Sequence, residues 1–173
     1  MSAPDDAAGS PRADFWLGPV DPIRIDSFRV ALGISILLYM AAWWRGGADE
    51  WLTASGFHVS SRALTSVPMA PLLPGWMLPW FGGLLFGSLI AWIIGWKTRY
   101  AGWVVLACVL YVSLADILSS YTLNKMFIVS LAVLACVPQG RYWSVAPASH
   151  TVQSVWPVRV LQLGMLIHYF VKF

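Results

Sequence analysis

The feature that most constrains the fold is a series of long apolar runs that carry almost no charge. The clearest one extends from Val30 to Trp44, and others lie between residues 75–96 and 100–118. A soluble domain covers its surface with polar side chains, and about 25% charged residues is usual. This chain has 11% charged and 58% hydrophobic residues. Such runs are tolerable where lipid, rather than water, surrounds them.

The apolar runs predict an all-α, polytopic transmembrane bundle of about five helices. A helix needs about 20 residues to cross a hydrocarbon core of about 30 Å. The predicted spans are residues 25–44, 75–96, 100–118, 123–138 and 155–173. The last span is the most diluted, since it contains Arg159, Gln162, His168 and Lys172.

The residues outside the spans form a tail and a connector. Residues 1–22 are rich in Ala, Asp, Gly, Ser and Pro, which predicts a mobile cytoplasmic tail. Residues 46–74 contain three prolines and predict an interfacial connector, with a short amphipathic helix near residues 61–67. The first 24 residues are polar, so no cleavable signal peptide is expected and the first span acts as its own anchor.

The distribution of Lys and Arg predicts the orientation. With the N-terminus inside, the cytoplasmic face would carry seven cations and the outer face four. The inner set is Arg12, Arg24, Arg29, Lys97, Arg99, Arg141 and Arg159, and the outer set is Arg45, Arg62, Lys125 and Lys172. Basic residues are in excess on the cytoplasmic side, so the prediction places the N-terminus inside and the C-terminus outside. The predicted location is a bacterial inner (plasma) membrane, which the protein crosses several times. The net charge of +3 is scattered, which argues against a nucleic-acid partner.

Small residues recur at every fourth position of the second predicted span: Gly83, Gly87, Ala91 and Gly95. Such a stripe lets another helix approach closely and is typical of helix packing in membranes. The plainer interpretation is the general enrichment of glycine in membrane helices. The stripe predicts partners among other membrane protein subunits.

Polar side chains inside the spans are the candidates for chemistry, because they are costly in hydrocarbon. Asp116 and Lys125 are expected near one membrane face, either as a solvated ion pair or as catalytic groups. His168 lies four residues before Lys172, a spacing in which the imidazole would be a candidate base. Asp26 and Arg29 share a helical face and are expected to neutralise each other at the interface.

A cofactor cleft is a further hypothesis. Asn124, Trp143 and Tyr169 are the candidate cofactor-binding residues, and a quinone, lipid or pigment tail is the expected ligand class. Cys108 and Cys136 lie in apolar runs and are expected to be ordinary hydrophobic residues. No Cys or His cluster has metal-ligand spacing, so no metal is expected.

Five stretches resemble the horizontally transferred transmembrane domain family, which includes the vitamin K-dependent γ-carboxylase. Their sequences are IDSFRVALG (25–33), WLTASGF (51–57), GWKTR (95–99), LNKMF (123–127) followed by RYWSV (141–145), and PVRVLQ (157–162) followed by Tyr169, Phe170 and Lys172. The resemblance extends from about residue 21 to the C-terminus. It implies a carboxylase-like helical fold in a short or truncated member.

Two departures limit what the resemblance implies about activity. The carboxylases carry an essential lysine shortly before an Asn-His motif. In this chain the matching place, near Ser119, has no lysine, and the histidine is replaced by Lys125. We therefore expect an accessory membrane subunit rather than a carboxylase. One alternative is a quinone-linked membrane enzyme, either an oxidoreductase or a carboxylase-like catalyst. The other alternative is a small transporter. Replacing Asp116 and Lys125 with alanine would distinguish the enzyme hypothesis from the subunit hypothesis.

Overall fold

The computed structural model describes residues 15–54, 71–115, 122–145 and 153–171, and these residues are almost entirely helical. In chain order the elements are β1 (Pro19–Val20), α2 (Pro22–Arg45), α3 (Ala48–Leu52), the 3-10 turn η2 (Gly75–Met77), α4 (Leu78–Ile93), α5 (Thr98–Ala115), α6 (Thr122–Ala135), β2 (Gln153–Ser154) and α7 (Trp156–Val171). The all-α prediction is confirmed for this part of the chain, with one two-residue ladder added.

Three segments are long and apolar enough to cross a membrane: Pro22–Arg45, Gly75–Ile93 and Thr98–Ala115. Two further apolar helices, α6 and α7, are shorter. Each falls on a predicted span, with ends that differ by a few residues. The predicted helix near residues 61–67 lies outside the described residues.

Helix α2 begins and ends where its sequence provides caps. The Asp21 side chain accepts a hydrogen bond from the Ile23 amide at 3.1 Å, and Pro22 occupies the first turn, where a missing N–H costs nothing. At the other end the Gly46 amide bonds back to the carbonyls of Ala42 and Trp43. Both ends of this long apolar helix are therefore set locally.

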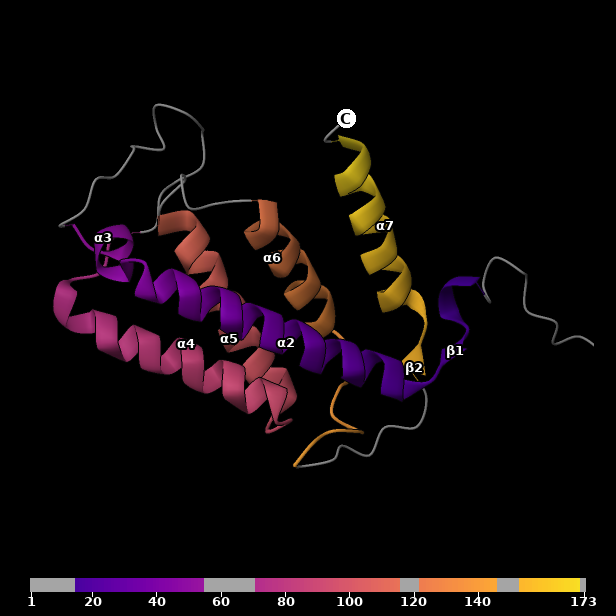
Figure 1. Cartoon of the computed structure of the whole chain (residues 1–173). Coiled ribbons are helices and arrows are strands. Elements are labelled where there is room, and N and C mark those ends of the chain that lie inside the picture. Colours follow the sequence, from indigo (N-terminus) through magenta and orange to yellow (C-terminus); the bar gives the residue numbers. More distant parts are fainter. Residues whose placement is uncertain (1–14, 55–70, 116–121, 146–152, 172–173) are drawn as a thin grey trace, which may run out of the picture.

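Helices α4 and α5 form an antiparallel hairpin. Gly95 (φ +82°) and Lys97 (φ +44°) both have left-handed backbone conformations, which end α4 at Ile93 rather than at the predicted residue 96. Thr98 then starts α5 directly. The tight turn places the two helices side by side, with α6 against α5 and α7 against α6 (Figure 1).

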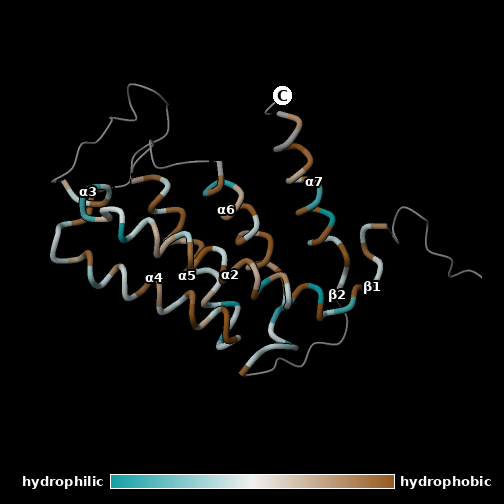
Figure 2. Tube along the Cα trace, in the orientation of Figure 1, coloured by the Kyte–Doolittle hydropathy of each residue, from teal (hydrophilic) through white to brown (hydrophobic). Residues whose placement is uncertain are grey.

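The bundle has two distinct ends (Figure 1). We name the end that holds the start of α2 the N-terminal end; the α4–α5 turn, the segment after α6 and the start of α7 also lie there. At the opposite end α3 packs under the end of α5, where Leu52 is buried with Val112 and Ala115. Figure 2 shows that apolar residues dominate the helices between these ends.

Residues 18–20, which belong to the predicted tail, pair with the segment that leads into α7. Pro19 pairs with Ser154 and Val20 pairs with Gln153 in an antiparallel ladder. The Val155 amide also donates to the Gly18 carbonyl at 2.9 Å. This short ladder fastens the segment before α2 to the start of α7.

Three glycines outside the predicted stripe mark where helices approach each other most closely. A Cβ added to Gly33 would lie 2.6 Å from an Ile93 side-chain atom, and one added to Gly82 would lie 2.7 Å from the Trp44 ring. A Cβ at Gly102 would lie 3.2 Å from Nε1 of Trp92, a side chain that is fully buried. The α2–α4 and α4–α5 contacts thus depend on the absence of these side chains.

Candidate functional site

The N-terminal end of the bundle contains a buried polar cluster centred on Asp26. Its two carboxylate oxygens accept hydrogen bonds from three consecutive backbone amides: Gly140 at 2.9 Å, Arg141 at 3.0 Å and Tyr142 at 2.7 Å. The Asp26 side chain is 0% exposed. Three such bonds to an ionised carboxylate replace the water that burial removes.

Arg29, one helical turn further along α2, bonds to the same segment from the other side. Its guanidinium donates to the Trp92 carbonyl at 3.2 Å, to the Trp143 carbonyl at 2.9 Å and to the Tyr142 carbonyl at 3.4 Å. The side chain is also 0% exposed, and its Nε lies 3.9 Å from Asp26 Oδ1. We name Asp26, Arg29 and the backbone of residues 140–143 the polar clamp.

The α4–α5 turn is tied to the same segment. The Ser144 hydroxyl donates to the Gly95 carbonyl at 2.6 Å, and the Val145 amide donates to the Ile94 carbonyl at 3.0 Å. The Thr98 hydroxyl donates to the Gln139 carbonyl at 3.1 Å. The polar clamp and these bonds therefore join α2, the α4–α5 turn and the segment after α6 into one unit.

The expectation that Asp26 and Arg29 neutralise each other is met only in part, because their side chains come within 3.9 Å but have backbone groups as their main partners. Both side chains point into the bundle, and each directs its polar atoms mainly at backbone groups rather than at the other. The three-residue spacing identified one shared face of α2, but not that this face meets a turn more than a hundred positions away. Backbone groups are the main hydrogen-bond partners of both charged side chains. The polar clamp therefore holds α2, the end of α4 and residues 140–143 in one arrangement.

The structure places only some of the sequence-predicted candidates. Asp116 lies outside the described residues, and of His168 and Tyr169 only the backbone is described. Asn124 is buried in the first turn of α6, whereas the neighbouring Lys125 is exposed.

Asn124 and Trp143 are not brought together as one cleft. Asn124 begins α6, whereas Trp143 lies beyond its other end, is 65% exposed and has a φ of +51°. The Trp143 ring is exposed, whereas its backbone carbonyl accepts a hydrogen bond from Arg29. In the described part of the chain, no three His, Cys, Asp or Glu side chains gather as metal ligands would.

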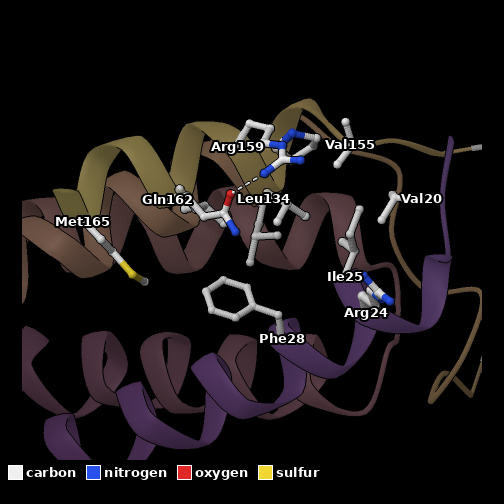
Figure 3. Close-up of a pocket in the computed structure, with 12 residues that line it drawn as sticks. Val20, Arg24, Ile25, Phe28, Leu134, Val155, Arg159, Gln162 and Met165 are labelled. Atoms are coloured by element: carbon white, nitrogen blue, oxygen red, sulfur yellow. Dashed lines mark hydrogen bonds between the residues drawn. The ribbon is translucent and has the colours of Figure 1, made fainter. Parts of the chain in front are cut away.

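A cavity of about 340 Å³ lies between α2, α6 and α7, next to the β1–β2 ladder (Figure 3). Its walls are apolar apart from Arg24, Arg159 and Gln162. Figure 3 shows Phe28 of α2 pointing toward the space that faces Gln162 and Met165 of α7. Sequence analysis missed this site because its residues come from three segments that are far apart in the chain.

A second groove of about 300 Å³ continues between α6 and α7 and shares Leu161 and Met165 with the cavity. Lys125 lines this second groove, together with Met126, Val129, Ser130, Gly164 and Ile167. Grooves of this size lie at the lower end of the range of roughly 300–1,000 Å³ for small-molecule sites. The two spaces form a path along α7.

The predicted packing stripe divides into two parts. A Cβ added to Gly83 or Gly87 would meet no atom within 4 Å, so these residues face away from the described bundle. Gly95, by contrast, is buried against Ser144, and Ala91 is partly buried against the core. Among the described residues, the end of the stripe next to the α4–α5 turn packs inside the bundle, whereas Gly83 and Gly87 do not.

Comparison with known proteins gives no counterpart for this arrangement. No family model, no curated protein and no solved structure matches the chain. The functional interpretation is therefore built on the polar clamp, the cavity between α2, α6 and α7, and the outer face of α4.

Proposed function

We propose that the chain is an accessory subunit of a membrane protein complex, with five membrane spans, a cytoplasmic N-terminus and a location in a bacterial inner membrane. The observation that carries this proposal is the outer face of α4. This face is apolar and exposed, and no described atom covers its two glycines, Gly83 and Gly87. The polar clamp bonds α2 to the Trp92 end of α4.

The outward side chains support the membrane location. Trp76 and Trp80 are exposed at the start of the η2–α4 segment, and Trp96 and Tyr100 are exposed at the α4–α5 turn. Tryptophan and tyrosine are enriched at both interfaces of a bilayer. Between these aromatic groups the outward residues are apolar, as lipid or a partner helix requires.

The outer face of α4 supports the subunit assignment. In the most apolar stretch of this segment 22% of the residues are buried within the chain, compared with 44% for α5. Trp80, Gly83, Leu84 and Gly87 share one helical face and all are exposed. Small residues flanked by large apolar ones provide a shallow track into which a partner helix fits.

The polar clamp supports a carboxylase-like transmembrane fold. Three of the stretches that resemble the γ-carboxylase family, residues 25–33, 95–99 and 141–145, meet at this one place. Segments with a shared role in one structural unit are expected to keep their residues together. The likeness to that family is therefore proposed at the level of the fold, without the carboxylation reaction.

Membrane integration is the first prediction to test. The full chain is expected to stay in the pellet after alkaline carbonate extraction, because several apolar helices cannot be solvated by water. A reporter fused before residue 15 is expected to lie inside the cell, and a cysteine placed at exposed Ala54 is expected to react with an impermeant reagent from outside. Release into the supernatant, or labelling with the opposite orientation, would contradict the topology.

Gly83 provides the test of assembly. Gly83→Leu is expected to reduce the fraction of chain in a larger complex at least about fivefold, because the side chain fills the track on α4. The measurement is blue-native electrophoresis of membranes extracted with a mild detergent. Ala107→Leu, which adds similar bulk at an exposed position of α5, is the matched control and should leave the complex intact. A wild-type chain that migrates as a monomer, or equal effects of both variants, would refute the subunit proposal.

A further inference from the structure

We propose that the cavity between α2, α6 and α7 binds one anionic phospholipid, with its phosphate held by Arg24 and Arg159 and an acyl chain lying along Phe28, Leu161 and Met165. This inference rests on the membrane-spanning arrangement proposed above. It adds a lipid site that is separate from the outer face of α4.

The two cations line the same cavity from different helices. Arg24 lies in the first turn of α2, and Arg159 lies in the first turn of α7. Among the described residues neither guanidinium has a carboxylate within salt-bridge distance, and no Asp or Glu lines the cavity. The nearby Asp21 carboxylate is already engaged as the cap of α2. The cavity therefore has two positive charges that a ligand phosphate would neutralise.

Arg159 is held in a defined position. Its guanidinium stacks over the Phe15 ring at 4.3 Å, and its Nη1 donates to Oε1 of Gln162 at 3.1 Å. The buried Nε has no hydrogen-bond partner among the described residues. A fixed guanidinium with donors to spare suits phosphate, which accepts two parallel N–H bonds from arginine.

The depth of the site matches the layout of a phospholipid. Arg24 and Arg159 lie at the N-terminal end of the bundle, which faces the cytoplasm in the proposed topology. Phe28 lies one helical turn further in, and Leu161 and Met165 continue into the groove between α6 and α7. Basic pockets between membrane helices on the cytoplasmic side bind anionic headgroups. The charge thus lies at headgroup level and the apolar path runs toward the hydrocarbon.

The same features favour a phospholipid over the other ligands that an apolar cleft would take. A quinone head is uncharged and would give neither guanidinium a counter-ion. A free phosphate would satisfy the cations but would make no use of the apolar path. An anionic phospholipid satisfies both parts.

The test uses native mass spectrometry of the purified full chain in a non-ionic detergent. Dioleoylphosphatidylglycerol is expected to give a one-to-one adduct at least about tenfold more abundant than the adduct with dioleoylphosphatidylcholine at equal concentration. The double variant Arg24→Ala/Arg159→Ala should lose this preference. The matched control, Arg45→Ala/Arg99→Ala, removes two exposed cations from outside the cavity and should keep it. Met165→Trp, which fills the apolar path but retains both cations, should also weaken the adduct about tenfold.

Each other outcome overturns the lipid site. Equal adducts with both lipids, or equal losses in the two double variants, would show general charge attraction. Binding of inorganic phosphate with the same dependence on Arg24 and Arg159, unaffected by Met165→Trp, would assign the cavity to a soluble anion. Size-exclusion profiles identical to wild type establish that the variants are folded. Carbonate extraction tests the membrane location independently, so failure of that proposal is distinguishable from failure of this one.

Discussion

Replacing Arg29 with alanine is expected to lower the free energy of unfolding by about 3–5 kcal/mol, the largest effect expected for a single side chain. The substitution removes the donors that serve the carbonyls of Trp92, Tyr142 and Trp143. It also removes the guanidinium whose Nε lies 3.9 Å from the buried Asp26 carboxylate. The segment after α6 would then keep its bonds to Asp26 and to the α4–α5 turn, but α2 would lose its guanidinium bonds to that segment and to the Trp92 carbonyl of α4.

The measurement is thermal unfolding of the purified chain in mild detergent. Arg29→Lys is expected to recover only a small part of the loss, because an ammonium group cannot reach three carbonyls in the fixed fork of a guanidinium. Arg45→Ala, at the exposed end of the same helix, is the control and should change stability by less than about 0.5 kcal/mol. Equal unfolding midpoints for Arg29→Ala and Arg45→Ala would show that the polar clamp does not stabilise the fold.

The second large effect is expected at Gly95, where alanine should destabilise the chain by about 3 kcal/mol. A Cβ there would lie 2.4 Å from Ser144 Oγ and 2.5 Å from Ser144 Cα, so a rotamer change cannot relieve the overlap. The φ of +82° adds a cost of roughly 1–2 kcal/mol for a residue with a side chain. Together the overlap and the strain force the α4–α5 turn away from the segment after α6.

Gly83→Ala is the matched control for Gly95→Ala, since both belong to the same predicted stripe. Gly83 has open space around it and lies inside α4, so alanine is expected to be neutral or to stabilise the helix by up to about 1 kcal/mol. A double variant with Ser144→Gly should recover only part of the loss, because the overlap with the Ser144 backbone remains. Similar unfolding midpoints for the two alanine variants would contradict the packing at Gly95.

The positions of the helices could be predicted because the signals for them are local. Long uncharged runs give the spans, and Asp21, Pro22 and Gly46 bound α2 within the chain's own sequence. The predicted end of α4 is too late in the sequence. A tight turn with two left-handed residues depends on a contact with a distant part of the chain as well as on the local sequence. That contact is Ser144 against Gly95.

The orientation of each helix about its axis could not be predicted. In a soluble protein the polar face of a helix points to water and thereby sets its rotation. Helix α4 is apolar on every side, because both the core and lipid accept apolar residues. Gly82 and Gly83 are therefore equivalent in the sequence, although one lies under the Trp44 ring and the other faces outward.

The candidate site was only partly predictable for a related reason. Asp26 and Arg29 were recognised as a pair on one face, but their partners lie more than a hundred positions later in the chain. In the sequence, Arg24 and Arg159 are two of eleven scattered cations. Only the fold shows that they line one cavity. The sequence of a single helix does not indicate long-range contacts of this kind.

The β1–β2 ladder has a consequence for biosynthesis. It joins residues on either side of almost the whole bundle, as the 138-position separation between Trp16 and Ser154 shows. A ribosome must synthesise all the helices from α2 to α6 before the partner of β1 emerges. Until then β1 has no partner strand, so closure of the bundle by this ladder follows the synthesis of α2 to α6.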